Sequence, residues 1–223
     1  MRKIATLLVL LCMFGTAAHA ETAWVQGQHY FPIKPAQPTN VAPGKVEVVE
    51  VFSYGCIACN SFYPTMEKLI AALPKNTQVG YVHASFNSAE AWPMFQRAFV
   101  TAQAMGIADK THQAMFNAVW ATGELAVIDR QTNRIKNPLP SIENAAAFYA
   151  RVGGVKAADF LAIAKSFSIE SKIKSAEMAM RGYGVDSTPT MVVNGKYRLT
   201  AQSAGGNDQL IELVKYLVAK EAK

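Results

Sequence analysis

The sequence predicts an α/β fold that is interrupted by a long, entirely helical insertion. Three observations support this fold class. A β-branched run, VEVVEVF at Val46–Phe52, leads directly into two closely spaced cysteines and an amphipathic segment. Strand signals then vanish from about residue 88 to residue 183. They return in TMVVNGKYRL, a hairpin signal that precedes a last amphipathic segment near the end of the chain.

The first 20 residues have the pattern of a secretory signal peptide. Two basic residues follow the first Met, residues 4–14 are apolar, and an Ala-His-Ala cleavage signal ends at Ala20, directly before Glu21. The apolar run is too short to remain as a membrane-spanning helix. We therefore expect residues 1–20 to be a signal peptide that is cleaved between Ala20 and Glu21, and the protein to be exported to the periplasm.

The composition of the remaining chain predicts one domain with a large insertion. Removal of 20 residues from the 223-residue chain leaves 203, and 51% of the whole chain is hydrophobic, which is ample for a core. The formal net charge is +6, and the two basic residues of the signal account for two of these charges. Because Lys and Arg are dispersed, without a basic run, we expect no nucleic-acid partner.

Turn residues and apolar spacing define the elements around the cysteines. A helix is expected to follow them and to end near Leu73-Pro74, and a second strand is expected at residues 78–84. The apolar face of this helix is Phe62, Met66, Leu69 and Ile70.

Helices are predicted through the middle of the chain, and strands return after it. The first helix begins at Pro93 and ends before Gly106. The others are expected around Met115–Trp120 and at residues 142–152, 157–167 and 170–183, with a loop at 128–140. Asn194-Gly195 predicts a two-residue turn between strands at 190–193 and 196–199. A last helix carries Leu210, Leu213, Val214 and Leu217 on one face.

Cys56 and Cys59 are the only cysteines after the predicted signal peptide. Cys12 lies within the signal, and the bulky Leu11 before it argues against a lipoprotein anchor. As a structural staple the pair would close a very small loop, worth only about 2 kcal/mol before strain is subtracted. As a metal site it supplies two thiolates, which suit a Cu(I) carrier better than a four-ligand zinc site.

The histidines do not extend the cysteine pair into a larger metal site. His29, His83 and His112 all lie far from the cysteines in sequence, and we interpret each as a surface or core residue. We therefore expect no bound metal.

Redox catalysis is the third interpretation of the pair. Cysteines three positions apart lie on one face of the first helical turn, where a disulfide forms with little movement. The unpaired N–H groups of that turn favour a thiolate on the first cysteine. Cys56 would then be the exposed nucleophile and Cys59 the shielded, resolving thiol, while Gly55 lets the backbone turn from strand into helix.

The chain resembles the DsbA family of exported thiol:disulfide interchange proteins, in the thioredoxin superfamily. The matching motifs are VEVVEVFSYGCIAC, the helical block, and GVDSTPTMVVNGKYRL near the end, in the family's order. The resemblance implies a thioredoxin-like fold formed by residues 21–87 and 169–223. Residues 88–168 would form an inserted all-helical domain.

The resemblance implies roles for five residues. Cys56 matches the attacking cysteine and Cys59 the resolving one. Pro189 matches the family's cis-proline rather than a trans proline that merely begins a strand, and Thr188 offers its backbone groups to an extended substrate. Glu50 matches a buried acid near Cys59, where burial would raise its pKa and make it a proton acceptor. The alternative of a solvated glutamate at the end of the strand stays open.

Four positions depart from the family pattern. Ile57-Ala58 replaces the Pro-His of most oxidases, Thr188 stands where oxidases more often carry Val, and Tyr81 stands where many members have a lysine opposite the buried acid. The missing histidine should leave the Cys56 thiolate less favoured and the disulfide less oxidising. These departures leave the strength of the oxidant open.

The leading hypothesis is a monomeric periplasmic dithiol oxidase without a cofactor. Its substrates would be reduced or unfolded exported proteins, and the resemblance implies reoxidation by a membrane, quinone-linked partner of the DsbB type. The alternative is a disulfide isomerase or reductase that is kept reduced. Only some 25 residues would precede the first core strand, which leaves no room for the dimerisation domain of DsbC-type isomerases.

Overall fold

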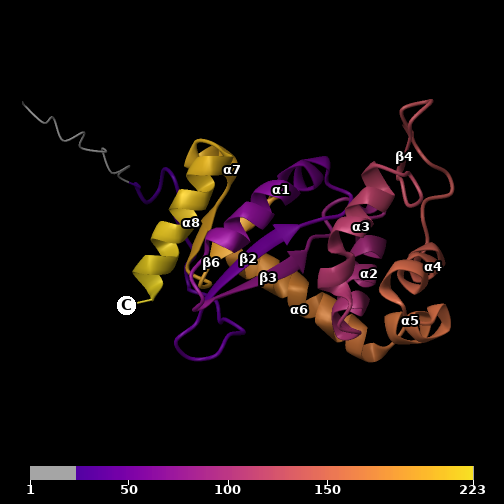
Figure 1. The fold of residues 1–223 in the computed structure, drawn as a ribbon, viewed down its shortest axis with the longest axis horizontal. Helices are drawn as coiled ribbons and strands as arrows, with labels where there is room; N and C mark the ends of the chain where they lie inside the picture. Colours follow the sequence, from indigo (N-terminus) through magenta and orange to yellow (C-terminus); the bar gives the residue numbers. More distant parts are fainter. Residues whose placement is uncertain (1–23, 223) are drawn as a thin grey trace, which may run out of the picture.

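The computed structural model describes residues 24–222, which form a five-stranded sheet and a block of helices beside it (Figure 1). The predicted signal peptide, residues 1–20, and its cleavage between Ala20 and Glu21 lie outside the described residues. The strands follow the order β1-β7-β6-β2-β3 across the sheet. Their bounds are Phe31–Pro32 for β1, Val46–Phe52 for β2, Thr77–His83 for β3, Thr190–Val193 for β6 and Tyr197–Leu199 for β7.

β2 is the central strand, and all seven of its residues are buried. It pairs in parallel with β3 and antiparallel with β6, so the VEVVEVF run is covered by a strand on each side. Helix α1 (Ile57–Ala72) connects β2 to β3, and α8 (Asn207–Glu221) packs beside it on the same face of the sheet. The carboxyl end of β2 therefore meets the start of α1, next to the helical block.

The helical block contains α2 to α6 and shares an apolar core with the sheet. The bounds are Trp92–Ala104 for α2, Ala108–Trp120 for α3, Ile142–Gly153 for α4, Ala157–Ala164 for α5 and Phe167–Tyr183 for α6. Helix α6 leads from this block back to the sheet (Figure 1). The predicted domain boundary after residue 168 falls in the first turn of α6. The division into residues 21–87, 88–168 and 169–223 stays a prediction.

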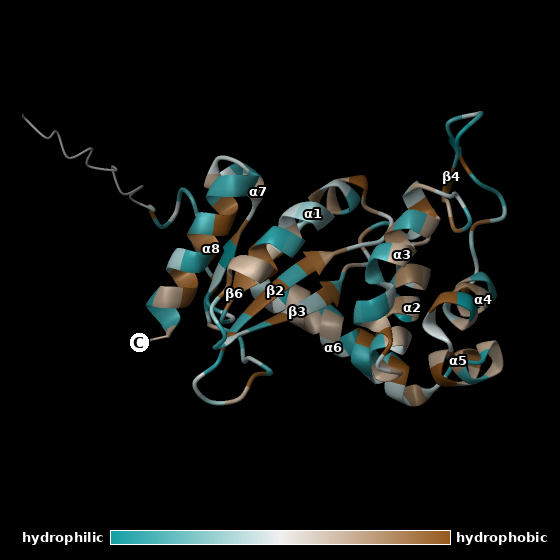
Figure 2. Ribbon diagram, viewed as in Figure 1, coloured by the Kyte–Doolittle hydropathy of each residue, from teal (hydrophilic) through white to brown (hydrophobic). Residues whose placement is uncertain are grey.

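The amphipathic patterns place most elements where the sequence predicted them. Leu210, Leu213, Val214 and Leu217 of α8 are all buried, and hydrophobic and hydrophilic residues alternate along this helix in Figure 2. Asn194 and Gly195 both have positive φ, and the Lys196 N–H donates to the Val193 carbonyl at 3.0 Å, as the predicted turn requires. Among residues 24–222, no helix combines the length and apolarity needed to cross a membrane.

Four sequence predictions about elements were wrong. The loop at 128–140 contains a short hairpin of β4 (Ile128–Asp129) and β5 (Arg134–Ile135). Ile70 is 43% exposed, because it lies at the edge of the buried face of α1. Helix α5 ends at Ala164, and α6 begins at Phe167 rather than residue 170. The Ser166 hydroxyl accepts the Ile169 N–H and so caps α6 early.

Candidate active site

The two cysteines lie where β2 turns into α1. The turn spans Ser53 to Cys56 and is closed by a hydrogen bond from the Cys56 N–H to the Ser53 carbonyl at 3.1 Å. Cys56 is the residue that caps α1, and its Sγ accepts the N–H of Cys59 at 3.3 Å. The first sulfur therefore sits at the positive end of the helix, where an anion is favoured.

Gly55 is required in this turn for space rather than for conformational freedom. Its φ is not positive, whereas the sequence predicted that it would ease the turn into the helix. A Cβ at this position would lie 2.5 Å from Trp92 Nε1 and 2.6 Å from Trp92 Cδ1, which is too close for any side chain. The indole of Trp92, from α2, therefore packs directly on the residue that precedes Cys56.

Both cysteines are free thiols and both are buried. Cys59 is fully buried, as predicted, but Cys56 is only 8% exposed, whereas the sequence predicted an exposed thiol. The Pro189 loop covers Cys56, and the Cys56 thiol donates to the Thr188 carbonyl at 3.5 Å. Ile57 beside it is 56% exposed, so an apolar side chain lies at the surface next to Cys56.

The surroundings shift the two thiols in opposite directions. The pKa of Cys56 is lowered, first by a hydrogen bond from the Cys59 thiol and then by the Thr188 side chain and the N–H groups of Cys59 and Ala58, against an opposing effect of burial. Burial raises the pKa of Cys59, and the hydrogen bond to Cys56 and the charge of Cys56 raise it further. These shifts favour a thiolate on Cys56 and a proton on Cys59 in the reduced protein.

The Pro189 loop has the geometry that the sequence predicted. The Thr188–Pro189 peptide bond is cis, and β6 begins directly after it. The Thr190 hydroxyl donates to the Ser187 carbonyl at 2.8 Å and holds the two sides of the loop together. Thr188 is thereby placed against Cys56 although 132 residues separate them in the chain.

Glu50 lies inside the protein near the sulfurs and is only 3% exposed. Burial, and then the charge of Cys56, raises its pKa to about 8. Its carboxylate in turn raises the pKa of Cys59. Tyr81 lies directly opposite Glu50 in the β2–β3 register, at the position that the sequence comparison suggested. Glu47 is buried as well, and its Oε1 accepts the Asn40 N–H at 3.0 Å.

Tyr54, in the turn before Cys56, is fully buried and is hydrogen-bonded to three side chains. Its N–H donates to His83 Nε2 at 3.0 Å, and its hydroxyl is 2.9 Å from His112 Nδ1. Trp120 Nε1 donates to its carbonyl at 2.8 Å. His112 and Trp120 belong to α3, so the helical block binds this turn directly. A polar aromatic residue next to a cysteine was the only signal in the sequence.

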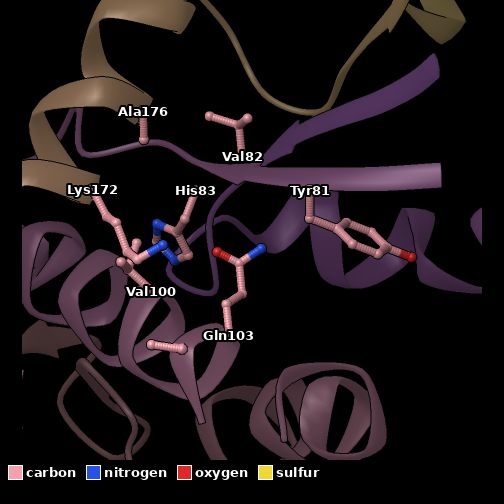
Figure 3. Close-up of a pocket in the computed structure, with 8 residues that line it drawn as sticks. Tyr81, Val82, His83, Val100, Gln103, Lys172 and Ala176 are labelled. Carbon is pink, nitrogen blue, oxygen red and sulfur yellow. The ribbon is translucent and has the colours of Figure 1, made fainter. Parts of the chain in front are cut away.

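Two cavities lie beside β3. One, of about 470 Å³, lies between α1, α3 and β3, and it includes the carboxylates of Glu67 and Asp109 and the ring of Tyr81. The other, of about 350 Å³, lies at the outer edge of β3 and includes Gln103 and Lys172. Figure 3 shows this second cavity, with the Tyr81 ring directed away from Lys172 and Gln103. Within residues 24–222, no three His, Cys, Asp or Glu side chains are grouped as a metal site.

Comparisons with known proteins identify the family. A family model described as Thioredoxin matches residues 42–213. The thiol:disulfide interchange protein DsbA of Pseudomonas syringae pv. tomato is 33% identical over 218 residues, which cover 98% of this chain and 94% of that protein. The chain belongs to the DsbA family. The DsbA of Azotobacter vinelandii is 35% identical over 82% of this chain and 80% of its own.

Solved DsbA structures share the fold. The crystal structure of Pseudomonas aeruginosa DsbA matches with a TM-score of 0.73 at 33% identity, covering 89% of this chain and 94% of its own. The DsbA of Xylella fastidiosa matches with a TM-score of 0.76 at 30% identity, covering 88% and 97%. The predicted thioredoxin-like fold with a helical insertion is confirmed. As predicted, this DsbA-family protein is a thiol-disulfide oxidoreductase.

Proposed function

We propose that this protein is a periplasmic dithiol oxidase that introduces disulfides into exported proteins through Cys56 and Cys59. One observation carries the proposal. Cys56 caps α1 among donors that lower its pKa, whereas Cys59 is fully buried and keeps its proton. A stabilised thiolate favours the reduced pair, and a pair that favours reduction is an oxidant towards its clients.

The reaction follows from this asymmetry. A client thiolate attacks Cys56 Sγ, the Cys56–Cys59 bond breaks, and Cys59 leaves with the electron pair. A second client thiolate then attacks the client sulfur of the mixed disulfide, and Cys56 leaves as a thiolate. Two electrons pass from the client to the enzyme. Of the two protons lost by the client thiols, one is balanced by the proton gained on Cys59 and the other stays in solvent.

Glu50 serves Cys59 as a proton partner in this scheme. Because burial raises its pKa, the Glu50 carboxyl keeps a proton that it gives to Cys59 as that sulfur leaves. When the enzyme is reoxidised, the ionised fraction of Glu50, a minority at neutral pH, accepts the proton of Cys59, which is the role that the sequence suggested. The burial of Glu50 and its effect on the pKa of Cys59 support this role.

Clients would bind as extended peptides beside the Pro189 loop. The backbone groups of Thr188 flank Cys56 and are suited to pair with a peptide main chain. The DsbA of Proteus mirabilis, which shares the fold at a TM-score of 0.69 and 22% identity, is known in complex with a non-covalently bound peptide, PWATCDS. Reoxidation by a membrane, quinone-linked partner and action as a monomer complete the proposal. The predicted signal peptide supports the periplasmic location.

Single-cysteine variants test the assignment. We would follow disulfide formation in a reduced client that carries two cysteines, starting from protein oxidised beforehand where both cysteines are present. Cys56→Ser should abolish oxidation of the client. Reduced Cys59→Ser should accumulate a mixed disulfide through Cys56 when the client cysteine carries a disulfide-linked leaving group that Cys56 can displace. Oxidation that survives in Cys56→Ser would contradict the proposal. Tight Cu(I) binding without oxidase activity would instead favour the copper carrier.

An isomerase or reductase is the second candidate, and one observation favours it. Ile57-Ala58 places no cationic side chain between the cysteines, so the Cys56 thiolate depends on hydrogen bonds and on the N-terminus of α1. A protein of this class would reshuffle scrambled disulfides in a client faster than it oxidises a reduced one. The ratio of these two rates, measured on the same client, separates the candidates.

A further inference from the structure

In the turn before Cys56, both polar groups of the central peptide are hydrogen-bonded. This peptide joins Tyr54 to Gly55. Its N–H, on Gly55, donates to the Ser53 hydroxyl at 3.1 Å. Its carbonyl, on Tyr54, accepts Trp120 Nε1–H at 2.8 Å. The first partner belongs to the turn itself, whereas the second comes from α3, 66 residues away in the chain.

The backbone of this turn allows two orientations of the central peptide. A four-residue turn adopts either of two main forms, which differ by rotation of the central peptide, and the second form needs positive φ at the third residue. Gly55 occupies that position and tolerates both signs of φ. In the structure its φ is not positive, and the Tyr54 carbonyl points at Trp120. Without the indole N–H, a buried carbonyl would lose its partner, which favours rotation of the peptide.

Rotation of this peptide would also break the bond from the Gly55 N–H to the Ser53 hydroxyl, and would leave the turn that ends at Cys56 less firmly held. Cys56 is the fourth residue of the turn, and its Sγ must meet donors that belong to other parts of the chain. These are the N–H of Cys59 in α1, at 3.3 Å, and the Thr188 side chain in the Pro189 loop. Because hydrogen bonds weaken steeply with distance and angle, a small displacement of the turn weakens the donors to the Cys56 sulfur together.

We propose that Trp120 is a positioning residue through which the helical insertion sets the redox equilibrium of the Cys56–Cys59 pair, by fixing the central peptide of the preceding turn. The inference rests on the proposed role of Cys56 as the reactive thiolate. Trp120 touches neither cysteine in this scheme. It acts on the turn, through its hydrogen bond to the Tyr54 carbonyl.

A second tryptophan provides a matched control. Trp92 also packs on this turn, against Gly55, and it also comes from the helical insertion. Its Nε1 is buried but donates to no group among the described residues. Trp92→Phe therefore reduces an aromatic contact with the turn and removes no hydrogen bond to it. Trp120→Phe reduces a similar contact and also removes the donor to Tyr54.

The test compares Trp120→Phe, Trp92→Phe and the unaltered protein in glutathione buffers, with free thiols counted at equilibrium. We expect Trp120→Phe to shift the equilibrium constant about tenfold towards the disulfide form, which corresponds to about 30 mV. The midpoint of thiolate formation on Cys56, followed by ultraviolet absorbance, should rise by about one pH unit. Trp92→Phe should change the redox equilibrium constant and the acid dissociation constant of Cys56 by no more than about twofold each.

Ser53→Ala keeps the test decisive if Trp120→Phe does not fold. This substitution removes the acceptor of the Gly55 N–H, at the other end of the same peptide. It should also shift the redox equilibrium constant towards the disulfide form and raise the midpoint of thiolate formation. Unfolding of the oxidised and reduced forms of each variant separates positioning from general destabilisation, because a merely structural role lowers both stabilities equally and leaves the equilibrium constant unchanged.

Three results would overturn the inference or its basis, and they are distinguishable. An unchanged equilibrium constant in Trp120→Phe, or an equal shift in Trp92→Phe, contradicts the role of Trp120 but leaves the proposed function intact. An ordinary thiol pKa for Cys56 in the unaltered protein contradicts the proposed function, and the inference with it.

Discussion

At the level of single side chains, burial and hydrogen bonding move the proton affinities of Glu50 and Cys56 in opposite directions. Burial of Glu50 favours its protonated form, whereas Cys56 is surrounded by donors that favour its thiolate. The two groups also raise each other's proton affinity through charge repulsion, because both are negative when ionised. A thiolate on Cys56 therefore helps to keep the proton on Glu50.

Replacement of Glu50 by Gln should remove a pH dependence of stability. The folded pKa of about 8 lies above the ordinary value of 4.5, so the contribution of Glu50 is fully present below pH 4.5 and is lost as the pH rises through 8. The loss is at most about 1.4 kcal/mol for each pH unit. Urea unfolding of the reduced proteins, to which this pKa applies, should show the stability of Glu50→Gln rising relative to that of the unaltered protein as the pH rises.

The exposed Glu67, replaced in the same way, serves as the control for this experiment. Glu67→Gln shows how far the loss of an exposed carboxyl by itself alters the pH profile of stability. If Glu50→Gln has the same profile as Glu67→Gln, the burial of the Glu50 carboxyl does not control its ionisation.

The Thr188 side chain should contribute to the low pKa of Cys56. Thr188→Val keeps the shape of the side chain and removes its hydroxyl, which is one of the donors to the Cys56 thiolate. Titration of the reduced variant by ultraviolet absorbance should give a thiolate midpoint above the pKa of about 6 expected for the unaltered protein. An unchanged midpoint would mean that the helix N-terminus and Cys59 act without Thr188.

At the level of elements, the site depends on how closely α2 approaches the turn between β2 and α1. Gly55→Ala would place a Cβ 2.5 Å from the Trp92 indole, and either the ring or the turn must move. We expect a loss of about 1–3 kcal/mol in the free energy of unfolding, as is typical of overpacked positions. Chemical denaturation of the oxidised protein measures it.

Gly80→Ala is the matched control for this prediction. Gly80 lies within β3, and an added Cβ there would meet its nearest neighbour, Val49, at an ordinary 3.9 Å. Equal stabilities of the two variants would contradict the claimed role of the close contact with Trp92.

The sequence allowed the local elements to be predicted, because each has its own pattern. VEVVEVF, the spacing of the cysteines and Asn194-Gly195 indicated β2, the start of α1 and the β6–β7 turn without reference to the rest of the chain. The wrong predictions concern the exposure of Ile70, the boundary between α5 and α6, and very short strands. β1 is two residues long and is defined by its pairing with β7, and the β4–β5 hairpin has no apolar alternation to reveal it.

The same distinction applies to the site. Cys56, Cys59 and Pro189 stand in recognisable motifs, and Glu50 is set by its place in a strand. The hydrogen bond from Trp120 to Tyr54 joins residues 66 positions apart in the chain. The contact between Trp92 and Gly55 joins residues 37 positions apart. One sequence does not reveal such pairs, since an aromatic residue in an amphipathic helix has the same pattern whether it packs on a core or on an active-site turn.

At the level of the whole molecule, the redox state of the pair is coupled to folding. The pKa of Cys56 falls from an ordinary 9.0 to about 6 on folding. The stability that the thiolate contributes to the reduced protein is therefore fully present above pH 9 and is lost as the pH falls through 6. The free energy of unfolding of the reduced protein should exceed that of reduced Cys56→Ala, and the difference should decline as the pH falls from 9 to 6. A difference that is independent of pH would mean that no thiolate is stabilised by the fold.

The reduction potential of the Cys56–Cys59 pair tests the central claim most directly. It is obtained from the protein without its signal peptide by equilibration in glutathione buffers and counting of free thiols. Stabilisation of the Cys56 thiolate predicts an oxidising pair, with a potential clearly above about −200 mV and towards the value of about −120 mV known for the strong oxidant of this family. A potential below about −200 mV, towards that of thioredoxin at about −270 mV, would contradict the oxidase assignment and favour a reductase or isomerase.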